Sequence, residues 1–275
     1  MPRPADIPAP LAASPLNPVH VLLLFGMAYG ACTIASTLLC HWIGFGETLR
    51  DRELVNGTLW SLILAALVAT LRPLRESVST WFRTPQSPLR FSDIAIATLL
   101  ITAFNVGVHR VLVVMPMVHS NPEYYDFWQL ASAYARATSA DYVVLALGTL
   151  AIGPLHEEVF FRGVLFDAIR ARRSLFLAVA ATSLLFGIMH GRNGLAAAFA
   201  GLVLAFVYLR YGSLWPALLV HVLGNVLVLP PLLAQFTLLK TRAQAQSYEG
   251  WFFEFLFAAL FVPLALAFWR RFRPT

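Results

Sequence analysis

The chain has 275 residues, of which 59% are hydrophobic and only 12% are charged, and its mean hydropathy is +0.69. Soluble domains carry about a quarter charged residues, so this composition excludes an ordinary soluble protein and predicts a polytopic membrane protein. The net charge of +6 comes almost wholly from arginine, and the basic residues lie in short loops between apolar runs, which argues against a nucleic-acid surface.

The predicted elements are all helices. Residues 1–18 are rich in proline and are expected to form a disordered tail, and residues 19–275 a single transmembrane helical domain. Eight apolar runs are long enough, or nearly so, to cross a bilayer. These runs lie near Val19–Ile43, Leu54–Leu71, Asp93–Val118, Asp141–Ile169, Leu175–His190, Gly194–Leu209, Leu214–Leu233 and Trp251–Trp269. We therefore predict an all-α bundle of about eight transmembrane helices.

The distribution of basic residues predicts the orientation of this bundle. With the N-terminus in the cytoplasm, the inner segments hold twelve basic residues: Arg3, Arg72, Arg75, Arg83, Arg90, Arg170, Arg172, Arg173, Arg210, Arg270, Arg271 and Arg273. The outer loops hold six: Arg50, Arg52, Arg136, Arg192, Lys240 and Arg242. Because basic residues favour the cytoplasmic side, both termini are expected inside.

The run LAIGPLHEEVFFRGVLFDAIRARR, which begins at Leu150, carries two adjacent carboxylates and an arginine within apolar sequence. A charged side chain inside a span costs roughly 2.5–3.5 kcal/mol, so each one needs a partner or a function. Glu158 and Arg162 share one helical face in the favourable order for an ion pair, whereas Glu157 points about 100° away. The spacing predicts that Arg162 neutralises Glu158 and leaves Glu157 for chemistry. A purely structural pair beside a water-facing acid is the alternative.

Two later spans carry further polar motifs. Phe186-Gly-Ile-Met-His190 places a phenyl ring and an imidazole on one face, and His221-Val-Leu-Gly-Asn225 stacks an imidazole and an amide. Taken alone, the first fits an interfacial histidine and the second a link between helices. At 1.5 Å per residue from the expected cytoplasmic ends, Glu157 lies ~20 Å deep, His190 ~24 Å, and His221 and Asn225 ~12 and ~18 Å. This overlap in depth favours one shared site.

A fourth polar group, formed by Asn105, His109 and Arg110, lies in the third predicted span. Its spacing is similar to that of the other motifs, but Pro116 follows it and the group lies toward the outer end of the span. Long basic side chains near the end of a span can reach the interface and leave their charge in water. We therefore interpret this group as structural, either by such snorkelling or as a link between helices, and assign it no further role.

The residue types at the predicted site suit attack by water. A carboxylate, two imidazoles and an amide, without serine, cysteine or aspartate, do not indicate covalent catalysis. Glu157 can take a proton from water, His190 can orient that water or donate to the leaving amine, and His221 and Asn225 can donate to an oxyanion. A divalent metal such as zinc, held by Glu157, His190 and His221, is an alternative activator. The zincin motif is absent, because Phe160 occupies its second histidine position.

Glu157-Glu158-x-x-x-Arg162, Phe186-x-x-x-His190 and His221-x-x-x-Asn225, in this order on separate spans, resemble the motifs of the CAAX-protease and bacteriocin-processing (CPBP, or Abi) intramembrane proteases. The resemblance covers roughly residues 142–231, which are expected to form the catalytic core. It implies an eight-helix bundle with a cavity open to the cytoplasm and the membrane. The implied activity is glutamate-dependent endoproteolysis near the C-terminus of a membrane-anchored substrate.

The resemblance also implies roles for individual residues. Glu157 is the general base with His190 beside it, His221 and Asn225 form the oxyanion site, and Glu158, Arg162 and Phe186 support the structure. Members of this family are usually described as metalloproteases, but a glutamate-plus-histidine mechanism needs no ion. No cofactor is therefore expected to be required, and the metal question is left open.

Two other functions are weighed against the protease. One is a non-proteolytic membrane scaffold or bacteriocin-immunity partner that uses the same bundle for binding. The other is a transporter with intramembrane acids as a proton relay, but no repeat relates the two halves of the chain. The expected partners are a membrane-anchored protein or peptide substrate and the lipid bilayer, with no nucleic acid. A bacterial plasma membrane is the expected location, whereas the substrate and the oligomeric state are not indicated by the sequence.

Overall fold

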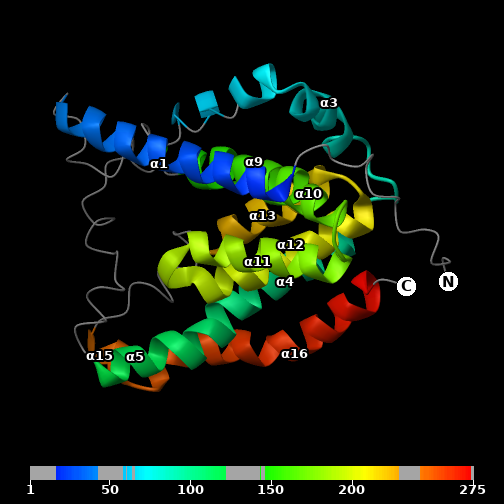
Figure 1. Ribbon diagram of the computed structural model, residues 1–275. Coiled ribbons are helices and arrows are strands. Elements are labelled where there is room, and N and C mark those ends of the chain that lie inside the picture. The colour runs from blue at the N-terminus through cyan, green and yellow to red at the C-terminus, as the bar shows by residue number, and fades with distance from the viewer. Residues whose placement is uncertain are drawn as a thin grey trace. The chain divides into compact units, whose positions relative to one another are not determined.

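A computed structural model of the chain describes residues 17–42, 58–59, 61–63, 66–121, 143, 146–228 and 242–273. Across these ranges the regular structure is helical, with 3-10 and π segments beside the α-helices and no strand (Figure 1). This confirms the predicted all-α class. The predicted disordered tail falls almost wholly on residues 1–16, which lie outside the described ranges, and a helix already begins at Pro18.

The apolar helices among the described residues lie where the apolar runs predict them, whereas the polar helix Arg72–Trp81 follows the second run and was not predicted. Three are long and apolar enough to cross a bilayer: Phe91–Ser120, Gly194–Tyr211 and Glu249–Phe272. Shorter apolar helices include Pro18–Ala28, Leu175–Met189 and Leu214–Leu227. The length and apolar composition of these helices are those of an integral membrane protein. The count of eight spans stays a prediction.

The chain forms two compact units. The first comprises Met1–Ser87, Ala137–Thr182 and Tyr208–Leu218, and the second comprises Pro88–Arg136, Ser183–Val207 and Leu219–Thr275. Three helices contribute residues to both units: α11 (Leu175–Met189), α12 (Gly194–Tyr211) and α13 (Leu214–Val228). The prediction of one domain over residues 19–275, with a catalytic core at about 142–231, stays a prediction.

In the first unit, α1 (Pro18–Trp42) packs against a long helical run. This run consists of η3 (Gly148–Ile152), α9 (Gly153–Glu158), η4 (Val159–Phe166) and α10 (Asp167–Arg170). The ring of Phe25 on α1 stacks on Phe160 at a centroid distance of 3.6 Å and meets Phe161 edge-on at 6.4 Å. Blue α1 lies along green α9 and α10 in Figure 1. Aromatic contacts therefore hold α1 against the helix that carries Glu157.

The π-helical turn η3 comes directly before Pro154, as expected of a proline inside a helix. A proline lacks the backbone N–H and its ring crowds the carbonyl four residues earlier, so the preceding turn widens. The N–H of Gly153 accordingly donates to the carbonyl of Gly148, five residues earlier. A Cβ added at Gly153 would lie 2.7 Å from that same oxygen, so this turn requires glycine. The irregular backbone of this turn ends at Ile152, five residues before Glu157.

In the second unit, one continuous helix packs along another. The first consists of α4 (Phe91–Thr102), η2 (Ala103–Val114) and α5 (Met115–Ser120). The second is α16 (Phe252–Phe272), preceded by α15 (Arg242–Gln246) and η6 (Glu249–Trp251) (Figure 1). A Cβ at Gly107 would collide with the backbone of Phe257 and Ala258, so a small residue permits this close approach. The Phe104 ring also packs against Phe261 at 5.6 Å.

Candidate active site

Helix α9 and the turns after it carry the three charged residues of the first motif. Glu158 and Arg162 are 0% and 1% exposed, and Arg162 Nη1 donates to Glu158 Oε1 at 2.8 Å. The predicted ion pair is therefore formed, although the backbone changes from α to π between its two members. The Phe161 ring also lies 5.9 Å from the guanidinium carbon of Arg162. Both charges are thus neutralised inside the first unit.

Glu157 is half-buried, in contrast to its fully buried neighbour. It adds to the electrostatic field at Arg162, but the short hydrogen bond of that guanidinium goes to Glu158. The two adjacent carboxylates therefore have different surroundings, as the spacing predicts. Because Glu158 and Arg162 are both buried, their face of the helix points into the first unit, and Glu157 points about 100° away from it.

His156 contributes a contact that the motif analysis missed. Its Nε2 lies 3.4 Å from the Oγ of Ser61, within the first unit. The contact joins positions 95 residues apart, so no local spacing could have indicated it. In the structure it links the turn that carries Glu157 to the segment around Ser61.

The second unit brings the two predicted imidazoles to one phenyl ring. Phe186, near the end of α11, is 2% exposed. Its ring lies 4.4 Å from that of His190 and 5.9 Å from that of His221, which belongs to α13. The close packing of α11 with α12 is visible at Gly187, where an added Cβ would lie 2.7 Å from the Cβ of Ala198. Phe186 thus positions both imidazoles.

Hydrogen bonding fixes the tautomer of His190. Its Nδ1 lies 2.7 Å from the backbone oxygen of Phe186, four residues earlier. A carbonyl oxygen can only accept, so Nδ1 carries the proton and donates it to this oxygen. In the neutral ring, Nε2 is then the acceptor. His190 follows the last residue of α11, so its ring is held at the end of a helix rather than in a mobile loop.

Asn225 lies one turn after His221 on α13 and is half-buried, whereas His221 is 8% exposed. Between them, Gly224 presents its backbone toward α4: an added Cβ would be 3.9 Å from the Cγ2 of Ile101. The amide and the imidazole therefore share a helix that packs within the second unit. Their predicted joint role stays a prediction.

The fourth polar group is a link between helices. Arg110, on η2, is buried, and its Nη1 lies 3.9 Å from Oε1 of the fully buried Glu254 on α16. Of the two interpretations offered by the sequence, snorkelling is wrong, because the side chain of Arg110 is only 7% exposed. The partner, Glu254, was missed because it lies in a different span. In the sequence, the only indication of this partner was an acidic residue, Glu254, near the start of the last apolar run.

A metal site requires several histidine, cysteine, aspartate or glutamate side chains close together. Within the described ranges, no three side chains of histidine, cysteine, aspartate or glutamate are grouped so as to hold a metal ion. A closed structural zinc site needs four such ligands and a catalytic site needs three. The sequence-based expectation that no cofactor is required stays a prediction.

Comparison with known proteins gives two matches. Residues 139–227 match the family described as Type II CAAX prenyl endopeptidase Rce1-like. The chain is also 26% identical over 220 residues to "Putative membrane peptidase YdiL" of Bacillus subtilis (strain 168), a match that covers 76% of this chain and 86% of that protein. No solved structure matches the chain. The family match contains all three polar motifs, from Glu157 to Asn225.

The helical fold, the buried charges and these matches define an integral membrane peptidase. More narrowly, residues 139–227 match the Rce1-like family, and most of the chain is similar to a protein described as a putative membrane peptidase. The resemblance read from the three motifs is thereby confirmed.

Proposed function

We propose that the chain is an intramembrane endopeptidase in which Glu157 activates the water that attacks the peptide bond. The observation that carries this proposal is the 2.8 Å bond between Arg162 and Glu158. This bond holds Glu158 in a fully buried ion pair, whereas the adjacent Glu157 lies on a different face of the helix and is half-buried. A carboxylate in a partly desolvated site is a competent general base.

In the proposed reaction, Glu157 takes one proton as the water oxygen attacks the carbonyl carbon. His190 Nε2 accepts a hydrogen bond from the same water, since its Nδ1 proton is donated to Phe186. His221 and Asn225 donate hydrogen bonds to the developing oxyanion, a form of stabilisation that is strong away from bulk water. The tetrahedral intermediate then collapses, the C–N bond breaks, and the proton held by Glu157 passes to the leaving amine.

The proposed substrates are membrane-anchored proteins or peptides, cut near their C-terminus. The match at residues 139–227 supports this class, because the matching family is described as Type II CAAX prenyl endopeptidase Rce1-like. A lipidated or single-span substrate also reaches a bilayer-embedded site by lateral diffusion. The arginine count supports placement of both termini in the cytoplasm, and a bacterial inner membrane is the proposed location.

The test is cleavage of a lipidated, single-span reporter by the purified chain in proteoliposomes. Glu157→Gln removes the base but keeps the size of the side chain, and cleavage is expected to fall by at least about a hundredfold. Glu249→Gln, at an exposed acid, is the matched control and is expected to cleave normally. Wild-type cleavage by a folded Glu157→Gln protein would overturn the proposal.

A further inference from the structure

Arginine side chains are concentrated in three stretches of the first unit. These stretches are α3 (Arg72–Trp81) with the segment after it as far as Ser87, α10 (Asp167–Arg170) with the turn after it, and the end of α12. Together they hold seven arginines: Arg72, Arg75, Arg83, Arg170, Arg172, Arg173 and Arg210. Against these seven, the same stretches contain two carboxylates, Glu76 and Asp167. The excess is therefore five positive charges.

One half-buried carboxylate joins all three stretches. Asp167, at the start of α10, accepts hydrogen bonds at Oδ2 from Trp81 Nε1 at 3.2 Å and from the Tyr208 hydroxyl at 3.1 Å. Both donors are 3% exposed. The indole also lies directly over Gly163, where an added Cβ would be 2.8 Å from the ring. Asp167 therefore fixes α3 and α12 to the helix that carries Glu157.

The segment after α3 is tied to the end of α12 by its own bonds. Arg83 Nε donates to the carbonyl of Gly212 at 2.9 Å, and the Ser213 hydroxyl donates to the carbonyl of Arg83 at 2.7 Å. Gly212 has φ +58°, a conformation that favours glycine, so the reversal there depends on that residue. These bonds make the three stretches one surface, which we call the arginine surface.

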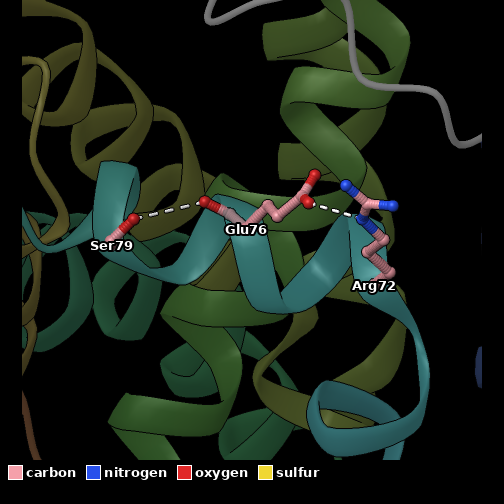
Figure 2. Close-up of polar contacts among 3 residues, drawn as sticks. All are labelled: Arg72, Glu76 and Ser79. Carbon is pink, nitrogen blue, oxygen red and sulfur yellow. Dashed lines mark hydrogen bonds and ion pairs between the residues drawn. The ribbon is translucent and has the colours of Figure 1, made fainter.

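Helix α3 lies on this surface with its apolar side inward. Leu74 and Trp81 are buried, whereas Arg72 and Arg75 are exposed. Arg72 Nε donates to Glu76 Oε1 at 2.7 Å, one turn along the exposed side (Figure 2). An amphipathic helix with basic residues outward is typical of segments that lie in the plane of a membrane interface.

Exposed apolar side chains adjoin the arginines. Arg172 and Arg173 are exposed, and Phe176, three residues further on, is 81% exposed. Trp215 is also half-exposed, while its indole N–H donates to the carbonyl of Phe82 at 3.0 Å. Aromatic side chains beside cations are characteristic of the headgroup region of a bilayer. An acidic soluble partner would not account for an exposed phenyl ring.

We propose that the arginine surface binds the phosphates of anionic phospholipids. Guanidinium groups match phosphate geometry with two parallel donors, and clustered basic residues beside a span bind anionic lipid with about 1 kcal/mol each, or roughly fivefold in affinity. The bonds through Asp167 link this surface to the Glu157 helix. Bound lipid would therefore hold that helix at a defined depth in the bilayer. This inference concerns a lipid site and holds whether or not the proposed catalytic mechanism is correct.

The test measures lipid enrichment around the full chain in nanodiscs of equal phosphatidylglycerol and phosphatidylcholine. The lipids that stay with the protein are quantified by mass spectrometry. The variant Arg172→Gln/Arg173→Gln removes two exposed arginines of the surface and is expected to lower phosphatidylglycerol enrichment by roughly tenfold or more. The comparison variant Arg270→Gln/Arg273→Gln removes the same charge from exposed positions at the end of α16. Only three arginines are clustered there, fewer than the four to eight typical of a lipid-binding cluster, so a clearly smaller loss of at most about fivefold is expected.

Equal losses in the two variants would show a general effect of net charge and would overturn the proposal, as would unchanged enrichment in the first variant. A second arm adds inorganic phosphate or sodium chloride at matched ionic strength. Equal displacement by both salts is expected if screening alone weakens a headgroup contact. Stronger displacement by phosphate would indicate a site for the soluble ion and would also overturn the lipid assignment.

Discussion

Two ion pairs buried among the described residues, one in each unit, are built in different ways. Glu158 and Arg162 are neighbours on one helix and approach to 2.8 Å, whereas Arg110 and Glu254 come from η2 and α16 and approach to 3.9 Å. The first pair exists as soon as its helix forms. The second exists only after two helices have packed. The Glu158–Arg162 pair therefore orients side chains on one helix, whereas the Arg110–Glu254 pair joins two helices.

The two ion pairs are also expected to contribute differently to catalysis. The Glu158–Arg162 pair adjoins Glu157, so its loss disturbs the proposed base directly. The Arg110–Glu254 pair lies between two helices that carry none of the proposed catalytic groups, so its loss disturbs packing first. Buried pairs are costly to break, because removal of one partner leaves the other charge desolvated. Both pairs therefore contribute to stability, but only the first is expected to contribute to the chemistry.

The largest expected effect follows loss of the local pair. Glu158→Ala leaves the guanidinium of Arg162 buried without its carboxylate and is expected to destabilise the protein by about 3–5 kcal/mol. Unfolding in detergent or bicelles measures the change. Glu249→Ala, at an exposed acid, is the control and is expected to change stability by less than about 0.5 kcal/mol. Similar stability of the two variants would contradict the account.

Double-mutant cycles sharpen the comparison. The coupling energy between Glu158 and Arg162 is expected to be about 2 kcal/mol, since charge-assisted bonds are roughly twice as strong as neutral ones. The coupling between Arg110 and Glu254 is expected near 0.6–1.7 kcal/mol, the range typical of polar contacts between membrane helices. Alanine variants at each position, singly and paired, give both values. A stronger coupling across helices than within one would reverse the interpretation.

A smaller effect is expected at Phe186, whose ring contacts both imidazoles. Phe186→Leu keeps an apolar side chain but removes the aromatic contacts, which are worth about 0.5–1.5 kcal/mol. We expect kcat to fall by roughly 2- to 10-fold with KM nearly unchanged, because ring positions rather than substrate contacts are altered. Phe206→Leu, whose ring packs on Phe268, is the matched control. Equal kinetic effects in the two variants would remove the positioning role.

The smallest effects are expected for ion pairs whose arginine is exposed to solvent. Arg271 Nη1 lies 2.6 Å from Oδ1 of the buried Asp93, but the arginine side chain is 40% exposed. Arg271→Gln is therefore expected to cost about 0.2–1 kcal/mol. Arg72→Gln removes the fully solvated pair with Glu76 and is expected to leave thermal stability unchanged. A melting shift at Arg72 as large as that at Glu158 would show that burial does not decide the strength of these pairs.

The features that follow from helix geometry could be predicted from the sequence. The helices begin and end near the ends of the apolar runs, and the four-residue spacing identified the Glu158–Arg162 pair. Contacts between distant segments could not be predicted. Glu254 lies 144 residues after Arg110, and no periodicity indicates which helix α16 will face.

The same limit applies within the candidate site. The spacing placed Phe186 and His190 on one face, but the approach of His221 to the Phe186 ring depends on the packing of α13 with α11. The hydrogen bonds at Asp167 and the contact of His156 with Ser61 arise in the same way. Each joins segments that become neighbours only in the folded chain.

The central claim, that the acid at position 157 and the imidazoles act on one water, is tested most directly by cross-linking. In a chain with Cys32→Ser and Cys40→Ser, the pair Glu157→Cys/His221→Cys is treated in membranes with a bifunctional thiol reagent that spans about 10 Å, the reach of a water-mediated contact between side chains. The pair Phe186→Cys/His221→Cys is the positive control, since those rings lie 5.9 Å apart. The account predicts that both pairs cross-link with similar yield. A cross-link in the control pair alone would contradict it.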